Sequence, residues 1–411
     1  MPHPLTTPYE EARALLLAAA EAGIPELEHL PLSDALGRVL AVDQTSPFNL
    51  PQTDNAAVDG YAVHAAFLAA HPDHLFDIIG TARAGHPFEG KAEPGQAVQV
   101  FTGAVMPDGP DCVLMHEDCR ISADGVICGK QLKTGTNMRP AGENLARGEL
   151  VAEQGTRLSA ADIGQLAAAG CAEVPVFRPL HVGVISTGDE LVEAGDARLI
   201  GQIFDSNRPM LAALCRQTGV RLTDFGIVKD NRASLTVAYQ TALEDCDVII
   251  SSGGASDGIE DHTQGAMQDI GAEPVFWRLA MKPGRPMAAG RRGQQMMFCL
   301  PGNPVAAFVC FRLLVSPVLD RLAGAAVRLP LSLMVASGFA HKKQAGRAEF
   351  LRAHLTLSPD GQQQACLHGR KGAGVISSLT GADGLVEIPF SATALAPGQP
   401  VRFYPFYEVA L

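Results

Sequence analysis

The sequence predicts a multidomain subunit that combines one α/β domain with β-rich domains before and after it. At 411 residues the chain is long enough for roughly two to four domains. From about residue 180 to 328, strands of near-continuous apolar character alternate with helices, the pattern of a parallel sheet covered on both faces. Residues 45–150 and the tail from about 329 contain short alternating strands separated by turns.

Composition excludes several classes of protein. The net charge of −12 gives the chain no general attraction for nucleic acid or an anionic membrane. The most apolar run, Val305–Leu319, is too short to span a bilayer and contains Arg312 and Pro317. The nine cysteines include no pair two residues apart, which is typical of reduced thiols in a cytoplasm rather than a disulfide framework or a zinc ribbon. We therefore expect a cytoplasmic protein with no nucleic-acid or membrane partner.

Two helices are predicted outside the α/β region. The first starts where Thr7 can cap it, Pro8 fits its first turn, and Glu10 completes a capping box; Gly23 can end it. The second runs from Ser159 to Ala169, and the strand EVPVF follows it.

Within the α/β region, strands and helices follow one another in regular order. Strands are predicted at 180–186, 221–228 and 247–252 and in the run MMFCLPG, and helices at 207–218, 231–244 and 261–270 and from Asn303 onward. In such sheets, ligands bind at the carboxyl ends of the strands. The loops that leave these strands are therefore the first place to look for a site.

Three consecutive strand ends carry glycines, carboxylates or both. They read Thr187-Gly188-Asp189-Glu190, then Lys229-Asp230, then Ser252-Gly253-Gly254, with Asp261 opening the next helix. Glycines let backbone N–H groups approach an anion, and carboxylates beside an anion make sense if Mg²⁺ lies between them and a phosphate. Each loop alone could equally be a plain turn or, for Asp261, a helix cap. Their shared edge favours a phosphate-type site.

Two further motifs fit an anion site. Lys282-Pro283-Gly284-Arg285-Pro286 places two cations around a rigid turn, and Pro301-Gly302-Asn303-Pro304 starts a helix at the same edge of the sheet. The alternatives are a solvated basic turn and an ordinary helix start.

The β-rich region holds candidates that chemistry alone does not separate from turn residues. Asp59 enters a strand beside a glycine, and Thr102 and Arg139 occupy comparable loops. No histidine has metal-ligand spacing, and no Ser or Cys has the context of an elbow-type nucleophile. His64 and His116 fit surface or structural positions.

Five motifs in order, DNAAVDGYAV, TGDEL, SSGGAS, KPGRP and LPGNP, give the chain a resemblance to a known family. Together they resemble the MoeA family of molybdopterin molybdenumtransferases, which includes the E domain of gephyrin, and the resemblance covers essentially the whole chain. It implies the last step of molybdenum cofactor synthesis, in which adenylylated molybdopterin and molybdate, with Mg²⁺, give the cofactor and AMP.

The resemblance also implies an elongated homodimer of four-domain subunits. Its active cleft would lie between the α/β domain of one subunit and the β-rich domain of the other. Possible further partners are the molybdopterin adenylyltransferase and apo-molybdoenzymes. The implied division is a linking domain (27–46 and 147–179), a β-rich insertion (47–146), an α/β molybdopterin-binding domain (7–26 and 180–328) and a C-terminal β domain (329–411).

Roles carried over motif by motif define the candidate site. The catalytic candidates are Asp59, Thr102, Glu190, Asp230 and Asp261, of which Asp230 and Asp261 would handle the magnesium-linked pyrophosphate. The substrate-binding candidates are Thr187, Gly188, Ser252, Gly253, Gly254, Lys282, Arg285, Pro301, Pro304, Arg139, Ser377, Ser378 and a basic position at Arg352 or Arg347.

The chain departs from the family pattern at two places. Asn144 replaces an acid that many relatives have, and Asp257 adds one beside the SSGGAS loop. The alternative to an enzyme is a non-catalytic scaffold or cofactor-binding paralogue of the MoeA or gephyrin type. A weaker alternative is the adenylylation of molybdopterin, for which the α/β unit alone would suffice. The acids at 59, 190, 230 and 261 favour the molybdenumtransferase.

Overall fold

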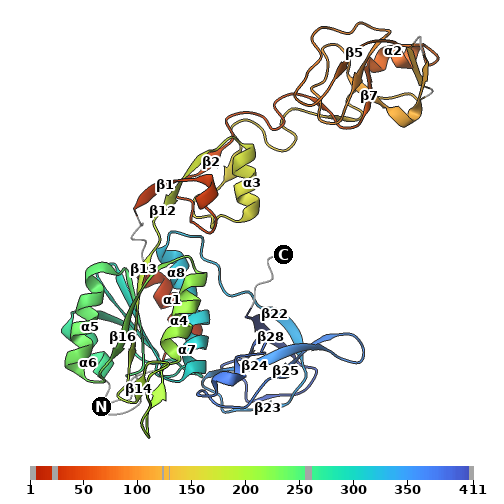
Figure 1. Ribbon diagram of the computed structural model, residues 1–411. Coiled ribbons are helices and arrows are strands. Elements are labelled where there is room, and N and C mark those ends of the chain that lie inside the picture. The colour runs from red at the N-terminus through yellow and green to blue at the C-terminus, as the bar shows by residue number, and fades with distance from the viewer. Residues whose placement is uncertain (1–5, 21–25, 123–124, 129, 255–261, 407–411) are drawn as a thin grey trace.

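The computed structural model describes residues 6–20, 26–122, 125–128, 130–254 and 262–406. Figure 1 shows an elongated subunit, with the α/β sheet and the C-terminal β structure side by side at one end. A small linking region follows, and a β-rich unit lies at the far end. This confirms the predicted fold class, while the boundaries of the four domains stay a prediction.

The central sheet of the α/β region has six strands in the order β16-β13-β17-β21-β20-β18. The first four are parallel, namely β16 (Arg221–Val228), β13 (His181–Thr187), β17 (Val248–Ser252) and β21 (Gln295–Leu300). The predicted parallel sheet is extended at one edge by two strands that were not predicted, β20 (Ala288–Arg292) and β18 (Glu273–Phe276), which run antiparallel. The turn between β20 and β21, at Gly293, is too short for a crossover, so these strands form a hairpin.

Helices cover both faces of this sheet, as predicted (Figure 1). One face carries α5 (Arg232–Asp245) and α6 (His262–Asp269) over a core that includes Leu235, Tyr239 and Met297. The other carries α4 (Asn207–Gln217), α7 (Pro304–Cys310), a π-helical turn (Phe311–Val315) and α8 (Ser316–Leu322). Among the described residues, no helix is both long enough and apolar enough to cross a bilayer.

The N-terminal helix α1 (Tyr9–Ala19) packs into the core of the second face through Tyr9, Ala12 and Leu16. The predicted cap by Thr7 is wrong, because Pro8 occupies the N-cap position and no side chain caps the helix. Thr7 instead uses its backbone in an extended pairing, donating to the Arg278 carbonyl at 2.9 Å. Gly23, the predicted end, lies outside the described residues.

The linking region is built from two short antiparallel pairs and one helix. The strands are β1 (Leu27–Pro31) with β12 (Glu173–Phe177), and β2 (Gln44–Thr45) with β11 (Leu150–Ala152). Helix α3 (Ala160–Ala168) begins at the predicted cap, where Ser159 and Asp162 form a capping box.

The β-rich unit contains a four-stranded sheet in the order β5-β6-β4-β7. Its strands are β5 (Asp77–Ala82), β6 (Gln96–Val100), β4 (Gly60–Val63) and β7 (Cys112–Met115), with α2 (Ala65–Ala70) beside them. Smaller pairs are β3 (Asn55–Ala56) with β10 (Met138–Arg139) and β8 (Cys119–Ser122) with β9 (Gly125–Cys128).

The C-terminal strands close into a barrel, since β24 pairs with β26 as well as with β25. The strands are β24 (Ala348–Leu357), β25 (Gln363–Leu367), β22 (Leu333–Ser337), β28 (Pro400–Pro405) and β26 (Gly384–Ile388). A strand from the α/β region, β19 (Met281–Lys282), adds to the edge of β24. The predicted KPGRP turn therefore begins at the seam between the two units.

Candidate active site

A pocket of about 340 Å³ lies at the carboxyl ends of the parallel strands. The crevice is expected there, because β13 leads to α4 on one face while β17 leads to α6 on the other. We name it the strand-end pocket. Its lining includes the predicted residues Thr187, Gly188, Glu190, Asp230, Ser252, Gly253, Gly254 and Pro304.

The double glycine after β17 lets the chain turn tightly against β13. Gly253 has φ +98°, and a Cβ placed there would lie 1.9 Å from the carbonyl oxygen of Thr187. Gly254 has φ +66°, and its Cβ would come within 2.6 Å of Thr263 Oγ1. Only glycine fits this close approach, which leaves backbone rather than side chains along this part of the pocket.

We expect Gly253→Ala to destabilise the protein by more than about 3 kcal/mol, because the methyl group meets rigid backbone in addition to the left-handed conformation. Gly201→Ala is the matched control: its φ is +92° and nothing lies within 4 Å, so only the conformational cost of about 1 kcal/mol applies. Urea unfolding of both variants measures the difference. Equal losses would show that the contact with Thr187 is not the constraint.

Carboxylates converge at the rim of the strand-end pocket. The Oδ1 atom of Asp230 accepts from Thr187 Oγ1 at 3.5 Å, and the Asp230 backbone N–H donates to Asp189 Oδ1 at 3.2 Å. The carboxylate of Glu190 folds back over Gly188, where a Cβ would lie 2.7 Å from Glu190 Oε2. Glu190 and Asp230, from two neighbouring loops, therefore line the pocket, and Asp189 holds the backbone of Asp230.

This donor set fits Mg²⁺ in kind, because its atoms are the hard oxygens that the ion prefers. The described residues contain no group of three His, Cys, Asp or Glu that could hold a metal ion alone. Mg²⁺ commonly takes one or two carboxylates and completes its shell with water and substrate phosphates. Asp261, the other predicted metal residue, and Asp257 lie outside the described residues.

Asn207, which sequence reasoning missed, ties two of these loops together. Its buried amide donates to Ser252 Oγ at 2.8 Å and to the Gly302 carbonyl at 2.8 Å. Ser252 in turn donates to the Pro301 carbonyl at 3.3 Å. The predicted residues Ser252 and Pro301 are therefore buried supports, and Pro304 forms the first turn of α7. Asn303 is the N-cap residue of α7, but its side chain forms no capping hydrogen bond.

Arg208, which the sequence analysis also missed, fixes the segment between β13 and α4. Part of this segment lines the strand-end pocket. Its guanidinium binds Asp205 at 3.0 Å, Asp224 at 2.6 Å, and Glu193. Burial alone would lower the pKa of Arg208, but the hydrogen bonds to Asp224, Asp205 and Glu193 outweigh it and raise the pKa. A signal in the sequence was the arginine three residues after Asp205 at the helix start, but its other partners, Glu193 and Asp224, are distant in the chain.

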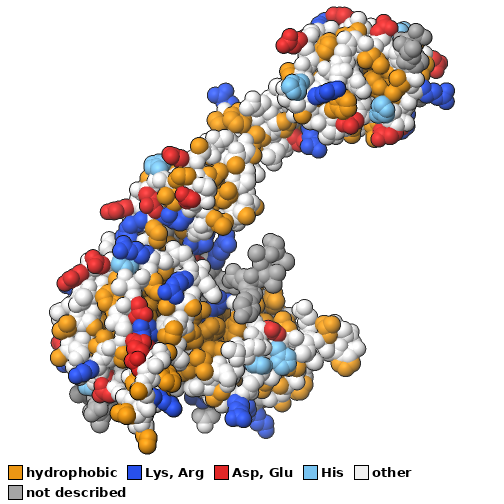
Figure 2. Space-filling model, viewed as in Figure 1, with side chains coloured by type: hydrophobic (Ala, Val, Ile, Leu, Met, Phe, Trp, Pro, Cys, Tyr) orange, Lys and Arg blue, Asp and Glu red, His pale blue; other side chains and the backbone are white. Residues whose placement is uncertain are grey.

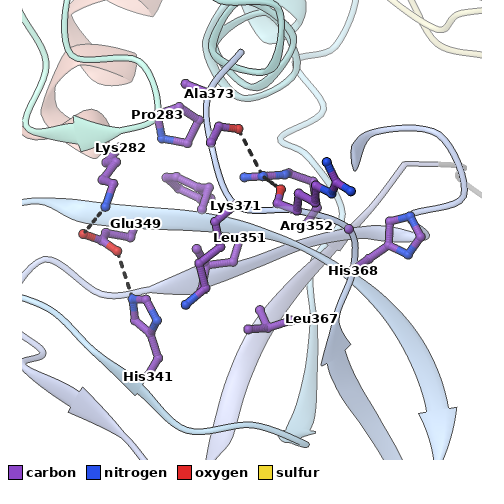
Figure 3. Close-up of a pocket in the computed structure, with 14 residues that line it drawn as sticks. Lys282, Pro283, His341, Glu349, Leu351, Arg352, Leu367, His368, Lys371 and Ala373 are labelled. Atoms are coloured by element: carbon purple, nitrogen blue, oxygen red, sulfur yellow. Dashed lines mark hydrogen bonds and ion pairs between the residues drawn. The ribbon is translucent and has the colours of Figure 1, made fainter. Parts of the chain in front are cut away.

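A second pocket of about 390 Å³ opens between β19 and the C-terminal barrel (Figure 3). We name it the seam pocket. It brings together the predicted residues Lys282 and Arg352. The other side chains on its wall include His341, Glu349, His368, Arg370 and Lys371.

Arg352 is a buried cation on this wall. Its Nε donates to Ser378 Oγ at 2.9 Å, and one terminal nitrogen donates to the carbonyls of Arg370 and Gly372 at 3.0 and 3.2 Å. Burial lowers the pKa of the guanidinium. These partners are neutral, so the positive charge is oriented without being cancelled by a carboxylate. A pocket with such a cation is suited to an anion.

We expect Ser378→Ala to cost about 1–3 kcal/mol of stability, because Arg352 Nε would lose its acceptor in a buried position. Ser377→Ala is the matched control, since Ser377 is exposed and should change stability by less than about 0.5 kcal/mol. Thermal unfolding followed by calorimetry distinguishes the two. If both variants unfold like the parent protein, Ser378 does not support Arg352.

The other predicted cations lie at different places relative to the seam pocket. Lys282 lies in register with Glu349 across the β19–β24 pairing, with Nζ 3.5 Å from Glu349 Oε1. Arg347 lies beside the same carboxylate at 3.3 Å. Arg285 is exposed on the KPGRP turn and lines neither pocket.

The two pockets adjoin, because one loop of the barrel lines both. Gly369–Ala373 faces the seam pocket, while Gly374 and Ile376 face the strand-end pocket. The loop is fixed to α7, where the Val305 N–H donates to the Ala373 carbonyl at 3.0 Å. A ligand spanning the loop would therefore reach the acids and the cations together.

Asp59, Thr102 and Arg139 lie in the β-rich unit, far from both pockets in the same chain (Figure 1). The Thr102 N–H and hydroxyl both donate to Asp59 Oδ1 at 2.7 Å. These two bonds lower the pKa of Asp59 and keep its carboxylate ionised. The structure thus separates the predicted site residues into two groups within one chain.

The fold and the two pockets define a multidomain α/β protein with a crevice of ligand size at the carboxyl ends of its parallel strands. Three family models match in order: the MoeA N-terminal region (domain I and II) over residues 7–170, the probable molybdopterin binding domain over 183–321, and the MoeA C-terminal region (domain IV) over 335–406. The chain belongs to the MoeA family.

Full-length relatives support the same family membership. The chain is 35% identical to the molybdopterin molybdenumtransferase of Haemophilus influenzae, over 93% of this chain and 94% of the relative. It is 33% identical to the molybdopterin molybdenumtransferase of Nostoc sp., over 92% and 88%. Two crystal structures of the molybdopterin biosynthesis MoeA protein from Pyrococcus horikoshii, 30% and 28% identical, cover 98% of this chain with TM-scores of 0.80 and 0.84.

Proposed function

We propose that the protein is a molybdopterin molybdenumtransferase, which inserts molybdate into adenylylated molybdopterin and releases AMP. The observation that carries this proposal is the pair of adjoining pockets, one rimmed by acids and glycines and the other lined by cations. The names of the full-length relatives support the same activity.

The strand-end pocket takes the pyrophosphate-bearing pterin in this proposal. The glycine backbone at 253 and 254 permits close approach of phosphate oxygens, and Thr187 orients the carboxylate of Asp230. Mg²⁺, when bound, neutralises phosphate charge; Asp230 would hold it together with Asp261, while Glu190 completes the acidic rim.

The seam pocket takes molybdate, a tetrahedral dianion. Arg352 on β24 is held rigidly by Ser378 and the loop carbonyls, while Lys282, whose side chain is 56% exposed, can reach the ligand from the neighbouring strand β19. The pterin supplies its own sulfur ligands for the metal, so the protein's contribution is to place the two substrates next to each other.

A second copy of the chain would complete the site. Asp59, Thr102 and Arg139 line neither of the two pockets, and the elongated subunit holds the β-rich unit away from the strand ends (Figure 1). A homodimer that places the β-rich unit of one subunit over the pockets of the other would bring both groups together. The same proposal includes hand-over between this protein, the molybdopterin adenylyltransferase and apo-molybdoenzymes in the cytoplasm.

The surface agrees with a small-molecule enzyme. On the face shown in Figure 2, acidic and basic side chains of the described residues are interspersed and form no broad basic stripe of the kind that tracks nucleic acid.

The test combines purified protein, adenylylated molybdopterin, Mg²⁺ and molybdate, and follows AMP release together with reconstitution of an apo-molybdoenzyme. The proposal predicts both, with AMP and active cofactor formed in equal amounts. A non-catalytic scaffold would bind the pterin but release no AMP. Release of AMP without active cofactor would contradict molybdenum insertion.

A further inference from the structure

Three side chains form a row along one wall of the seam pocket (Figure 3). Glu349 on β24 is in the middle and is 1% exposed. One carboxylate oxygen lies 3.5 Å from Lys282 Nζ on β19, and the other lies 2.9 Å from His341 Nε2 on β23 (His341–Lys342). A single buried carboxylate thus links a lysine and a histidine that both line the pocket.

The carboxylate of Glu349 opposes the binding of an anion, because it places a negative charge in a pocket whose other charged side chains are cations. Burial alone would raise the pKa of Glu349, but the hydrogen bond from His341 and the charges of Lys282 and Arg347 outweigh it and lower the pKa. Glu349 therefore stays ionised and draws the charge of Lys282 away from a ligand. How strongly it does so depends on whether His341 carries a charge of its own.

We propose that His341 is a positioning residue that shares Glu349 with Lys282, so that a protonated His341 neutralises the carboxylate and frees Lys282 to face an oxyanion. This inference rests on the proposed binding of molybdate in the seam pocket and adds its control by protonation. When His341 is neutral, Lys282 and Arg347 must balance Glu349, and the pocket presents less positive charge.

The direction of the pH dependence follows from the linkage between proton binding and anion binding. A dianion bound beside Lys282 is stabilised when His341 carries a proton, so the affinity for the dianion should rise as the pH falls. The charged groups facing Glu349 are Lys282 from β19, Arg347 and Lys343 from the loop before β24, and His341 from β23. Burial lowers the pKa of Lys343, whose ammonium donates to the Arg347 carbonyl at 2.7 Å.

A second histidine in the pocket offers a matched control. His368 lines the opposite side, near Arg352, and its Nε2 lies 2.9 Å from the Thr380 carbonyl rather than against a carboxylate (Figure 3). Its ring is paired with a neutral carbonyl, so its replacement should affect the affinity for an anion much less.

The experiment measures binding of sodium molybdate to the intact protein by calorimetry at several values of pH between about 5.5 and 8.5. We expect the affinity of the parent protein to fall about tenfold across this range. His341→Gln should bind with little dependence on pH, while His368→Gln should keep the parent slope. Glu349→Gln should also lose the slope and should bind molybdate more tightly than the parent at the high end, because Lys282 is then free at every pH.

The outcomes separate this inference from the proposed function. Molybdate binding with the same slope in His341→Gln as in the parent would overturn the role of His341 and leave the pocket assignment standing. Absence of molybdate binding in the parent at every pH would overturn both. Thermal unfolding of each variant confirms that it is folded, and Glu349→Gln provides an independent test if His341→Gln is unstable.

Discussion

Asp230→Asn should lower the rate of AMP release by about 100-fold or more, because the change removes a charge from the magnesium-linked edge of the site while keeping the shape of the side chain. Asp230 lies at the end of β16, where Thr187 orients its carboxylate and its own N–H is held by Asp189. The amide can still accept from Thr187, so the loop should keep its conformation. The predicted loss is therefore chemical rather than structural.

The measurement is AMP formed from adenylylated molybdopterin at a series of Mg²⁺ concentrations, followed by chromatography. Asp269→Asn is the control, because Asp269 pairs with Arg232 on the outer helices and lines neither pocket. It should retain the parent rate. Parent-like AMP release by Asp230→Asn at low Mg²⁺ would remove Asp230 from this role.

Arg352→Met should reduce molybdenum insertion by about 100-fold at low molybdate, because it replaces the oriented buried cation of the seam pocket with an apolar side chain of similar length. Raising the molybdate concentration should restore part of the activity, since the strand-end pocket is untouched. Arg352→Lys keeps the positive charge but should restore only part of the molybdenum insertion, because an ammonium cannot reproduce the three hydrogen bonds of the guanidinium.

Active cofactor formed as a function of molybdate concentration provides the readout. Arg292→Met is the control, because Arg292 is exposed at the end of β20, away from both pockets. A uniform loss at all molybdate concentrations, with unchanged unfolding temperature, would place the defect outside molybdate binding. Full insertion by Arg352→Met at low molybdate would contradict the assignment of the pocket.

The fold was largely predictable because its main signals are local. The apolar strands at 181–187 and 248–252 and the cap at Ser159 are each encoded within a few residues. The antiparallel edge of the sheet and the failure of Thr7 to cap α1 were not, because both depend on pairing with segments distant in the sequence. Local patterns do not report such partners.

The residues of the site also divide into those that local sequence patterns predict and those that they do not. Glycines and acids at strand ends were predictable, because the carboxyl ends of parallel strands meet at one edge. Arg208, Glu349 and His341 were missed, since their roles depend on partners that lie on other elements. Glu193 and Asp224 bind Arg208, while Glu349 lies between Lys282 and His341. Of the cations expected in the KPGRP turn, the structure places Lys282 in a pocket and leaves Arg285 exposed.

In the proposed homodimer, each active site combines the pockets of one subunit with Asp59 of the other. The most direct measurement uses dimers of defined composition, obtained by co-expressing two differently tagged chains and purifying through both tags. One dimer pairs an Asp59→Asn chain with an Asp230→Asn chain, and the other pairs a parent chain with a chain carrying both changes.

A shared site predicts that the first dimer keeps one intact site and about half of the parent activity, while the second has none. Sites contained within single chains predict the reverse pattern. Molybdenum insertion by the second dimer with none by the first would contradict the account.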